Sequence, residues 1–179
     1  MTGLIRAELL KIRTTKLVYW LGLTAAALAG VSVAGTVFSP QQAGMPALAT
    51  AQGVRTVFAA ASSGSALSMV LGIIGMAGEW RHRTATATFL GVPRRGRVVA
   101  AKVLAHAVIG FVYAVLVVAV TVLTAVICLR VKHVHYSITG GGIPSVLVGA
   151  ALVTVIYAVL GVGYGALVRN QIAAIVSAL

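Results

Sequence analysis

Long apolar runs, separated by short segments that carry the charged residues, dominate the pattern of this sequence. Lys, Arg, Asp and Glu are absent from four intervals, which are Leu17 to Val54, Thr56 to Gly78, Val103 to Leu129, and His133 to Val168. Each interval can supply the roughly 20 apolar residues that a helix needs to cross a bilayer core of about 30 Å. Because the runs are continuous and not alternating, the strands of a β-barrel are excluded. The pattern predicts an all-α, polytopic transmembrane helical bundle.

Within these intervals we predict four membrane spans, at 17–38, 57–77, 103–129 and 145–168. A fifth apolar run, 172–179, is too short to cross, so we expect a chain that is truncated within its fifth span. The first run is longer than the apolar region of a cleaved signal peptide, roughly 7–15 residues, which favours an uncleaved first span. The sequence thus predicts a single transmembrane domain over residues 1–179.

The residues before the first span form a predicted amphipathic helix, 1–16. Ile5, Leu9 and Ile12 recur at i, i+4 and i+7, and the cations of the segment lie elsewhere on the circumference. We expect this interfacial helix to lie along the inner membrane surface, with its cations near anionic head groups.

Composition supports the membrane class. The chain has 179 residues, of which 60% are hydrophobic and 9% charged, with a mean hydropathy of +1.04. Soluble domains carry roughly 25% charged residues. The net charge of +12 and the pI of about 11.2 could instead indicate nucleic-acid binding. We exclude that function because the cations cluster at the ends of apolar runs and do not line one polar face.

The distribution of the cations predicts an orientation. With a cytoplasmic N-terminus, most of the 14 cations lie on the inner side. These are Arg6, Lys11, Arg13, Lys16, Arg81, Arg83, Arg94, Arg95, Arg97, Lys102 and Arg169, against Arg55, Arg130 and Lys132 outside. The positive-inside rule therefore places the N-terminus in the cytoplasm and makes 78–102 a cytoplasmic loop.

Candidate chemistry is sparse, and the sequence predicts no enzyme. The two carboxylates, Glu8 and Glu79, are separated by a whole hairpin, so an acid–base pair is not expected. No P-loop occurs, and the span centres lack the ionisable groups that ion-coupled transport needs. His133 and His135 could ligate a metal, but two ligands in a loop favour solvent exposure. The lone Cys128 is interpreted as a small buried hydrophobe.

Small residues occur in two of the spans. Gly161 and Gly165 lie four apart, and Gly72 and Gly75 lie close together in the second span. This spacing is typical of faces at which membrane helices approach closely. A general richness in Ala and Gly explains it equally well, so the sequence leaves both interpretations open.

The 78–102 loop, GEWRHRTATATFLGVPRRGRVVAAK, differs most from its surroundings. A solvated hairpin on the positive side accounts for its arginines. It accounts less well for Phe89 and Leu90, or for Glu79 at the exit of the second span beside the interfacial aromatic Trp80. RTATATFL could form one or two helical turns that end before Pro93.

This loop, together with the N-terminal RAELLKIRTTK, resembles ABC-2-type transporter permeases, above all their actinobacterial members. The segment GALVRNQIAA, 165–174, is similar to the turn between the family's fourth and fifth spans. The resemblance implies a six-span permease of the bacterial inner membrane that pairs with a second permease copy. It also implies a separate cytosolic ATPase that binds ATP, so that this chain needs no cofactor of its own.

The resemblance further implies that the loop is a coupling element that docks into the ATPase and drives export. Phe89 and Leu90 would be the anchors, and Glu79 with the neighbouring arginines would fix the hinge to the second span. The implied site comprises Glu79, Arg81, Arg83, Thr84, Thr86, Thr88, Phe89, Leu90 and Pro93. The alternative is a non-transporting membrane anchor that recruits a cytosolic partner through the same loop.

Overall fold

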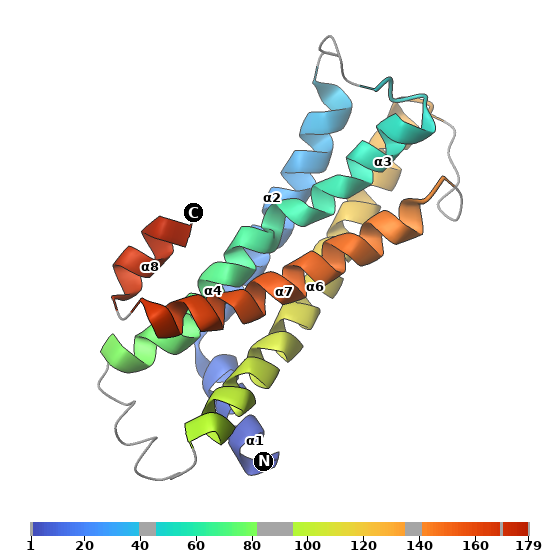
Figure 1. Cartoon of the computed structure of the whole chain (residues 1–179). Coiled ribbons are helices and arrows are strands. Elements are labelled where there is room, and N and C mark those ends of the chain that lie inside the picture. Colours follow the sequence, from blue (N-terminus) through green and yellow to red (C-terminus); the bar gives the residue numbers. More distant parts are fainter. Residues whose placement is uncertain (1, 40–45, 82–94, 135–140, 169, 179) are drawn as a thin grey trace.

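The computed structural model describes residues 2–39, 46–81, 95–134, 141–168 and 170–178, and every regular element in these ranges is a helix (Figure 1). The predicted all-α class is therefore confirmed for the described residues. The elements are α1 (Thr2–Thr14), α2 (Lys16–Phe38), α3 (Ala51–Ala59), the 3₁₀ helix η1 (Ala60–Gly64), α4 (Ser65–Arg81), α6 (Arg95–Val131), α7 (Ile143–Leu167) and α8 (Gln171–Ala178).

Four helical segments are long and apolar enough to cross a membrane, as predicted. They are Lys16–Phe38, Ala51–Gly78, Gly96–Val131 and Ile143–Leu167. All four begin before the predicted spans, and the second and third begin six and seven residues earlier. Gln, Arg and Lys are good helix formers, and a helix does not end where hydrophobicity ends. The chain is thus a multi-pass membrane protein by helix length and composition.

The second span is built from α3, η1 and α4 in succession. Thr50 caps α3, because its Oγ1 accepts a hydrogen bond of 3.1 Å from the backbone N–H of Gly53. The 3₁₀ turn that follows brings Gly64 against α2, where an added Cβ would lie 3.0 Å from the carbonyl oxygen of Ala25. The tighter turn therefore coincides with a close approach of two backbones.

The most extensive helix contact joins α4 and α7, which run side by side in Figure 1. A Cβ at Gly161 would overlap the carbonyl oxygen of Met69, and one at Gly72 would overlap that of Ala158. A Cβ at Gly165 would lie 2.9 Å from the carbonyl oxygen of Ile73. Of the two interpretations of these glycines, the structure therefore favours close helix packing.

Apolar side chains fill the space between the helices in separate clusters. One cluster near the α2–α3 connection joins Val37, Phe58 and Leu129, and it includes the buried Cys128, as the sequence indicated. A second cluster, at the opposite end of the bundle, joins Ile12, Leu71 and Tyr113. A third joins Ile73 and Ala77 of α4 to α8.

Helix α8 covers most of the run that was predicted as a partial fifth span. The chain turns at Asn170, whose Oδ1 accepts hydrogen bonds from the backbone N–H groups of Ile172 and Ala173. Tyr164 of α7 and Ser177 of α8 are joined by a hydrogen bond of 2.9 Å between their hydroxyl oxygens. The turn thus sends α8 back beside α4 and α7 (Figure 1).

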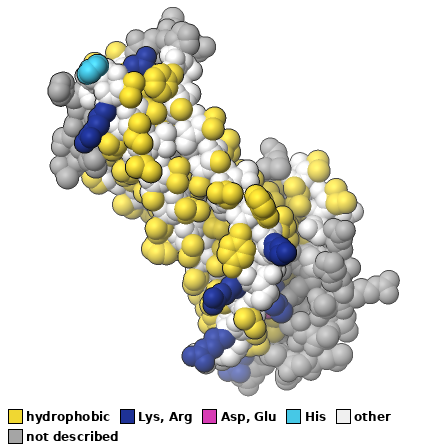
Figure 2. Space-filling view, turned by 180° about the vertical axis from the view of Figure 1, so that it is seen from behind, with side chains coloured by type: hydrophobic (Ala, Val, Ile, Leu, Met, Phe, Trp, Pro, Cys, Tyr) yellow, Lys and Arg dark blue, Asp and Glu magenta, His cyan; other side chains and the backbone are white. Residues whose placement is uncertain are grey.

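The outer surface of the bundle is an apolar band with cations at its two ends (Figure 2). Exposed large hydrophobic side chains lie along α2, α6 and α7. One end carries Arg6, Arg13, Lys16 and Arg97, and the other Arg55, Arg130 and Lys132. This arrangement fits a bilayer around the band; which end faces the cytoplasm stays a prediction.

The glycine contact gives a first test. We expect Gly161→Ala to destabilise the bundle by about 1–3 kcal/mol, because the new methyl group must displace the α4 backbone. Gly163, two residues along α7, has no other atom within 4 Å of an added Cβ, so Gly163→Ala is the matched control. Thermal unfolding in detergent measures both, and equal unfolding temperatures would contradict the close-packing interpretation.

Candidate functional site

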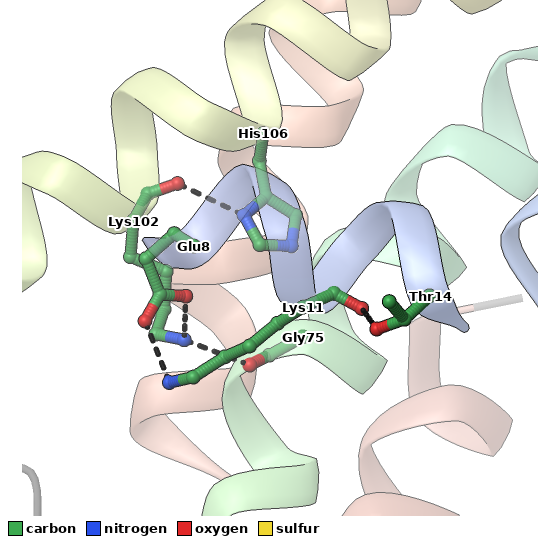
Figure 3. Close-up of polar contacts among 6 residues, drawn as sticks. All are labelled: Glu8, Lys11, Thr14, Gly75, Lys102 and His106. Atoms are coloured by element: carbon green, nitrogen blue, oxygen red, sulfur yellow. Dashed lines mark hydrogen bonds and ion pairs between the residues drawn. The ribbon is translucent and has the colours of Figure 1, made fainter. Parts of the chain in front are cut away.

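A buried lysine lies at the junction of α1, α4 and α6. Lys102 was counted among the cations of the inner side, and its side chain is only 3% exposed within the protein. Its Nζ lies 2.8 Å from Glu8 Oε2 on α1 and donates a hydrogen bond of 3.2 Å to the carbonyl oxygen of Gly75 on α4 (Figure 3). One ammonium group thus joins three helices.

Glu8 is buried on the side of α1 that faces this lysine. Its other oxygen, Oε1, accepts a hydrogen bond of 2.8 Å from Lys11, whose side chain is 54% exposed. Burial raises the pKa of Glu8, but the hydrogen bonds and charges of Lys102 and Lys11 outweigh it and hold the pKa below the ordinary value of 4.5. Glu8 is therefore an ionised carboxylate at neutral pH.

His106 extends the polar cluster along α6. Its Nδ1 lies 2.9 Å from the carbonyl oxygen of Lys102, and because a carbonyl can only accept, the Nδ1–H donates. The ring packs directly on Gly75, where an added Cβ would overlap Nε2. Gly75 therefore serves both neighbours, by its carbonyl oxygen for Lys102 and by its missing side chain for His106 (Figure 3).

Apolar contacts close the cluster on the side of α1. Ile12 is buried with Leu71 of α4 and Tyr113 of α6, and Leu9 packs against the same group. Ile5 is half-buried. The apolar face that was predicted to meet the membrane surface thus contacts other helices, because sequence periodicity does not distinguish a lipid-facing side from a protein-facing one. Whether α1 also borders the membrane stays a prediction.

Most of the implied coupling site lies outside the described residues. This applies to Arg83, Thr84, Thr86, Thr88, Phe89, Leu90 and Pro93. Glu79 and Arg81 belong to the last turn of α4. The structure therefore brings together the two flanks of the loop, at Gly75 and Lys102, and leaves the assignment of the loop itself as a prediction.

The sequence reasoning missed Glu8, Lys102 and His106 as a cluster. The available signal was that Lys102 follows the apolar stretch VVAA and is followed by another, and that the N-terminal segment holds one of only two carboxylates. Among the described residues, no group of three His, Cys, Asp or Glu side chains could hold a metal ion. The cluster thus acts as a buried ion pair that joins helices.

Removing the carboxylate of Glu8 should destabilise the bundle by breaking its ion pair with Lys102. We expect Glu8→Gln to lower the free energy of unfolding by about 3 kcal/mol, because the buried Lys102 loses its counter-charge. Lys11→Met, which removes the exposed partner of the same carboxylate, should lower it by at most about 1 kcal/mol. Trp fluorescence during denaturation in detergent measures both variants.

A double-mutant cycle with Glu8→Gln and Lys102→Met checks that the effect comes from the pair. Once one partner is gone, loss of the other should cost less, so the double variant should be more stable than the sum of the single effects predicts. Strict additivity would contradict a direct interaction.

Lowering the pH should destabilise the bundle by protonating the same carboxylate, Glu8. Because the pKa of Glu8 is lower in the folded state, the stabilisation is complete above the unfolded value of about 4.5 and is lost as the pH falls through the folded value. We expect the stability difference between the native chain and Glu8→Gln to shrink between about pH 5 and pH 3. Unfolding in buffered detergent at several pH values measures it, and a difference that does not change with pH would contradict the ionised pair.

No protein-family model matches this chain, and no curated protein matches it either. The likeness of the 78–102 loop to ABC-2-type permeases thus remains a resemblance of sequence.

Proposed function

We propose that this chain is the membrane-spanning permease subunit of an ATP-driven exporter of the ABC-2 type. In this proposal a separate ATPase binds the 78–102 loop and supplies the energy. The observation that carries the proposal is the buried polar contact of Lys102, which joins the two flanks of that loop. Gly75 precedes the loop and Lys102 ends it. The buried ammonium group of Lys102 binds the carbonyl oxygen of Gly75 and the carboxylate of Glu8 on α1.

Because Lys102 joins α4, α6 and α1, a force applied to the loop can be passed to all three helices. A push on a loop between two loosely held helices would be absorbed by the loop. Here the ends of α4 and α6 are joined, so displacement of the loop moves both helices and α1 together. Helix α4 in turn packs closely on α7 through Gly72 and Gly161. Movement at the loop thus reaches three of the four candidate spans.

The positions of the ionisable groups support an external source of energy. Among the described residues, the buried acidic and basic side chains are Glu8, Lys102 and His106, which lie together at one end. The buried polar side chains farther along the spans are the neutral Ser68, Thr121 and Thr154. A relay for coupled ions needs ionisable groups spread across the membrane, whereas the buried acidic and basic groups described here are confined to one end of the bundle.

The proposed coupling residues can be tested by placing a negative charge at Phe89 or Leu90. We expect Phe89→Asp or Leu90→Asp to abolish co-purification of the ATPase and its stimulation by the permease, because a carboxylate cannot enter an apolar groove. Phe89→Leu keeps an apolar side chain and is the matched control. The unfolding temperature of the bundle should be unchanged in all three variants.

Two results would overturn the proposal. Retention of the ATPase by both Asp variants would show that the docking residues are wrong. Capture of another cytosolic protein in place of an ATPase, with binding lost in the same variants, would instead support the anchor function. An ATPase encoded beside this chain would be the simplest independent support.

A further inference from the structure

The cations at the α1 end of the bundle greatly outnumber the carboxylates that could neutralise them. The chain has 14 Lys and Arg against 2 acidic residues. One of the two, Glu8, is occupied by Lys102 and Lys11. Arg13 and Lys16, at the connection between α1 and α2, are exposed, and no carboxylate of the described residues pairs with them. Both cations are therefore accessible to an anionic ligand from outside the chain.

The connection between α1 and α2 has a fixed geometry. The Thr14 hydroxyl donates to the carbonyl oxygen of Leu10 at 3.0 Å, and the Thr15 hydroxyl donates to that of Lys11 at 2.8 Å. The Tyr19 hydroxyl reaches back from α2 and donates to the carbonyl oxygen of Arg13 at 2.9 Å. These bonds satisfy carbonyl groups at the end of α1 and hold Arg13 beside the first turn of α2.

One face of α2 continues from this connection as an exposed stripe. Lys16, Tyr19, Trp20 and Leu23 lie at i, i+3, i+4 and i+7, so they share a side of the helix. Tyr19 is 60%, Trp20 66% and Leu23 59% exposed. The order along the stripe is cation, amphipathic aromatic, then aliphatic, which matches the order of phosphate, glycerol and acyl chain in a phospholipid.

The other end of α2 provides a contrast. There Lys132 lies over the ring of Phe38, with Nζ 5.1 Å from the ring centroid, so the cation already has an aromatic partner within the chain. Tyr19 and Trp20 are exposed beside Arg13 and Lys16 instead. The two ends of α2 thus differ in what they offer to a ligand.

We propose that the connection between α1 and α2 is a binding site for one anionic phospholipid. Arg13 and Lys16 bind the phosphate and the acidic head group, Tyr19 and Trp20 lie at the level of the glycerol, and Leu23 contacts the acyl chain. The site goes beyond general partition into a bilayer, because it selects lipids by head-group charge at one place. It does not depend on the proposed transport function.

The test compares two pairs of neutralised cations at the same end of the bundle. The chain is placed in nanodiscs of phosphatidylcholine and phosphatidylglycerol, released into detergent, and its retained lipid is measured by native mass spectrometry. We expect one phosphatidylglycerol to be retained in preference to phosphatidylcholine. The Arg13→Gln/Lys16→Gln variant should lower this preference roughly thirtyfold, at roughly fivefold per cation.

Arg6→Gln/Arg97→Gln removes the same charge from exposed positions off the stripe and should keep the preference within roughly twofold. Equal losses in the two double variants would overturn the site and indicate diffuse attraction instead. Charge-preserving Arg13→Lys/Lys16→Arg should retain the lipid, and its failure to do so would also count against the site. If inorganic phosphate displaces the retained phosphatidylglycerol, the site binds a free anion, and the assignment to a phospholipid is wrong.

Unfolding in nanodiscs of phosphatidylcholine alone checks that the variants fold. If Arg13→Gln/Lys16→Gln is less stable there, Lys16→Gln and Arg6→Gln alone provide the comparison, with a roughly fivefold loss expected only for the first. Trp20→Leu should lower the amount of retained phosphatidylglycerol without altering the net charge. An unchanged head-group preference in Lys16→Gln, together with unchanged lipid retention in Trp20→Leu, would contradict the proposed site.

Discussion

The contact between the backbones of α4 and α7 is the constraint on which the rest of this bundle depends. Lipid is as apolar as the helix surfaces, so burial alone gives membrane helices little reason to associate. Gly72 and Gly161 let the two backbones meet, and dispersion contacts over their length then favour the pair. With α4 held in this position, Gly75 on a neighbouring part of its surface is presented to α6, and the polar cluster can form.

The buried ion pair depends on that placement and extends it to α1. An ammonium group removed from water loses several kcal/mol of hydration, which only well-placed partners offset. Lys102 has a carboxylate from α1 and a carbonyl oxygen from α4, at hydrogen-bond distances. Such a pair contributes specificity more than stability, because α1 has a single carboxylate, Glu8, to pair with Lys102. The amphipathic helix is thereby fixed to the bundle and not merely attracted to it.

The sequence predicted the spans well and the cluster poorly, for a physical reason. A span is a local property, since some 20 apolar residues suffice, and the four candidate spans of the structure overlap the four predicted runs. Glu8 and Lys102 are 94 positions apart, and nothing local marks them as partners. A lysine near a helix end can extend its side chain to water or turn inward, and the neighbouring helices decide. The implied coupling residues lie outside the described part of the chain, so the resemblance alone supports them.

Helix α2 relates these features to the membrane. Its 23 residues span about 35 Å, close to a bilayer core of about 30 Å. The Lys16–Trp20 end and the Phe38–Lys132 contact therefore lie near the two boundaries. Helix α6 has 37 residues, about 55 Å, and meets α2 at this second boundary. About 20 of its residues cross the core, so Lys102 lies beyond the first boundary, at the level of α1. There the lysine could have reached water, and Glu8 holds it inside the protein instead.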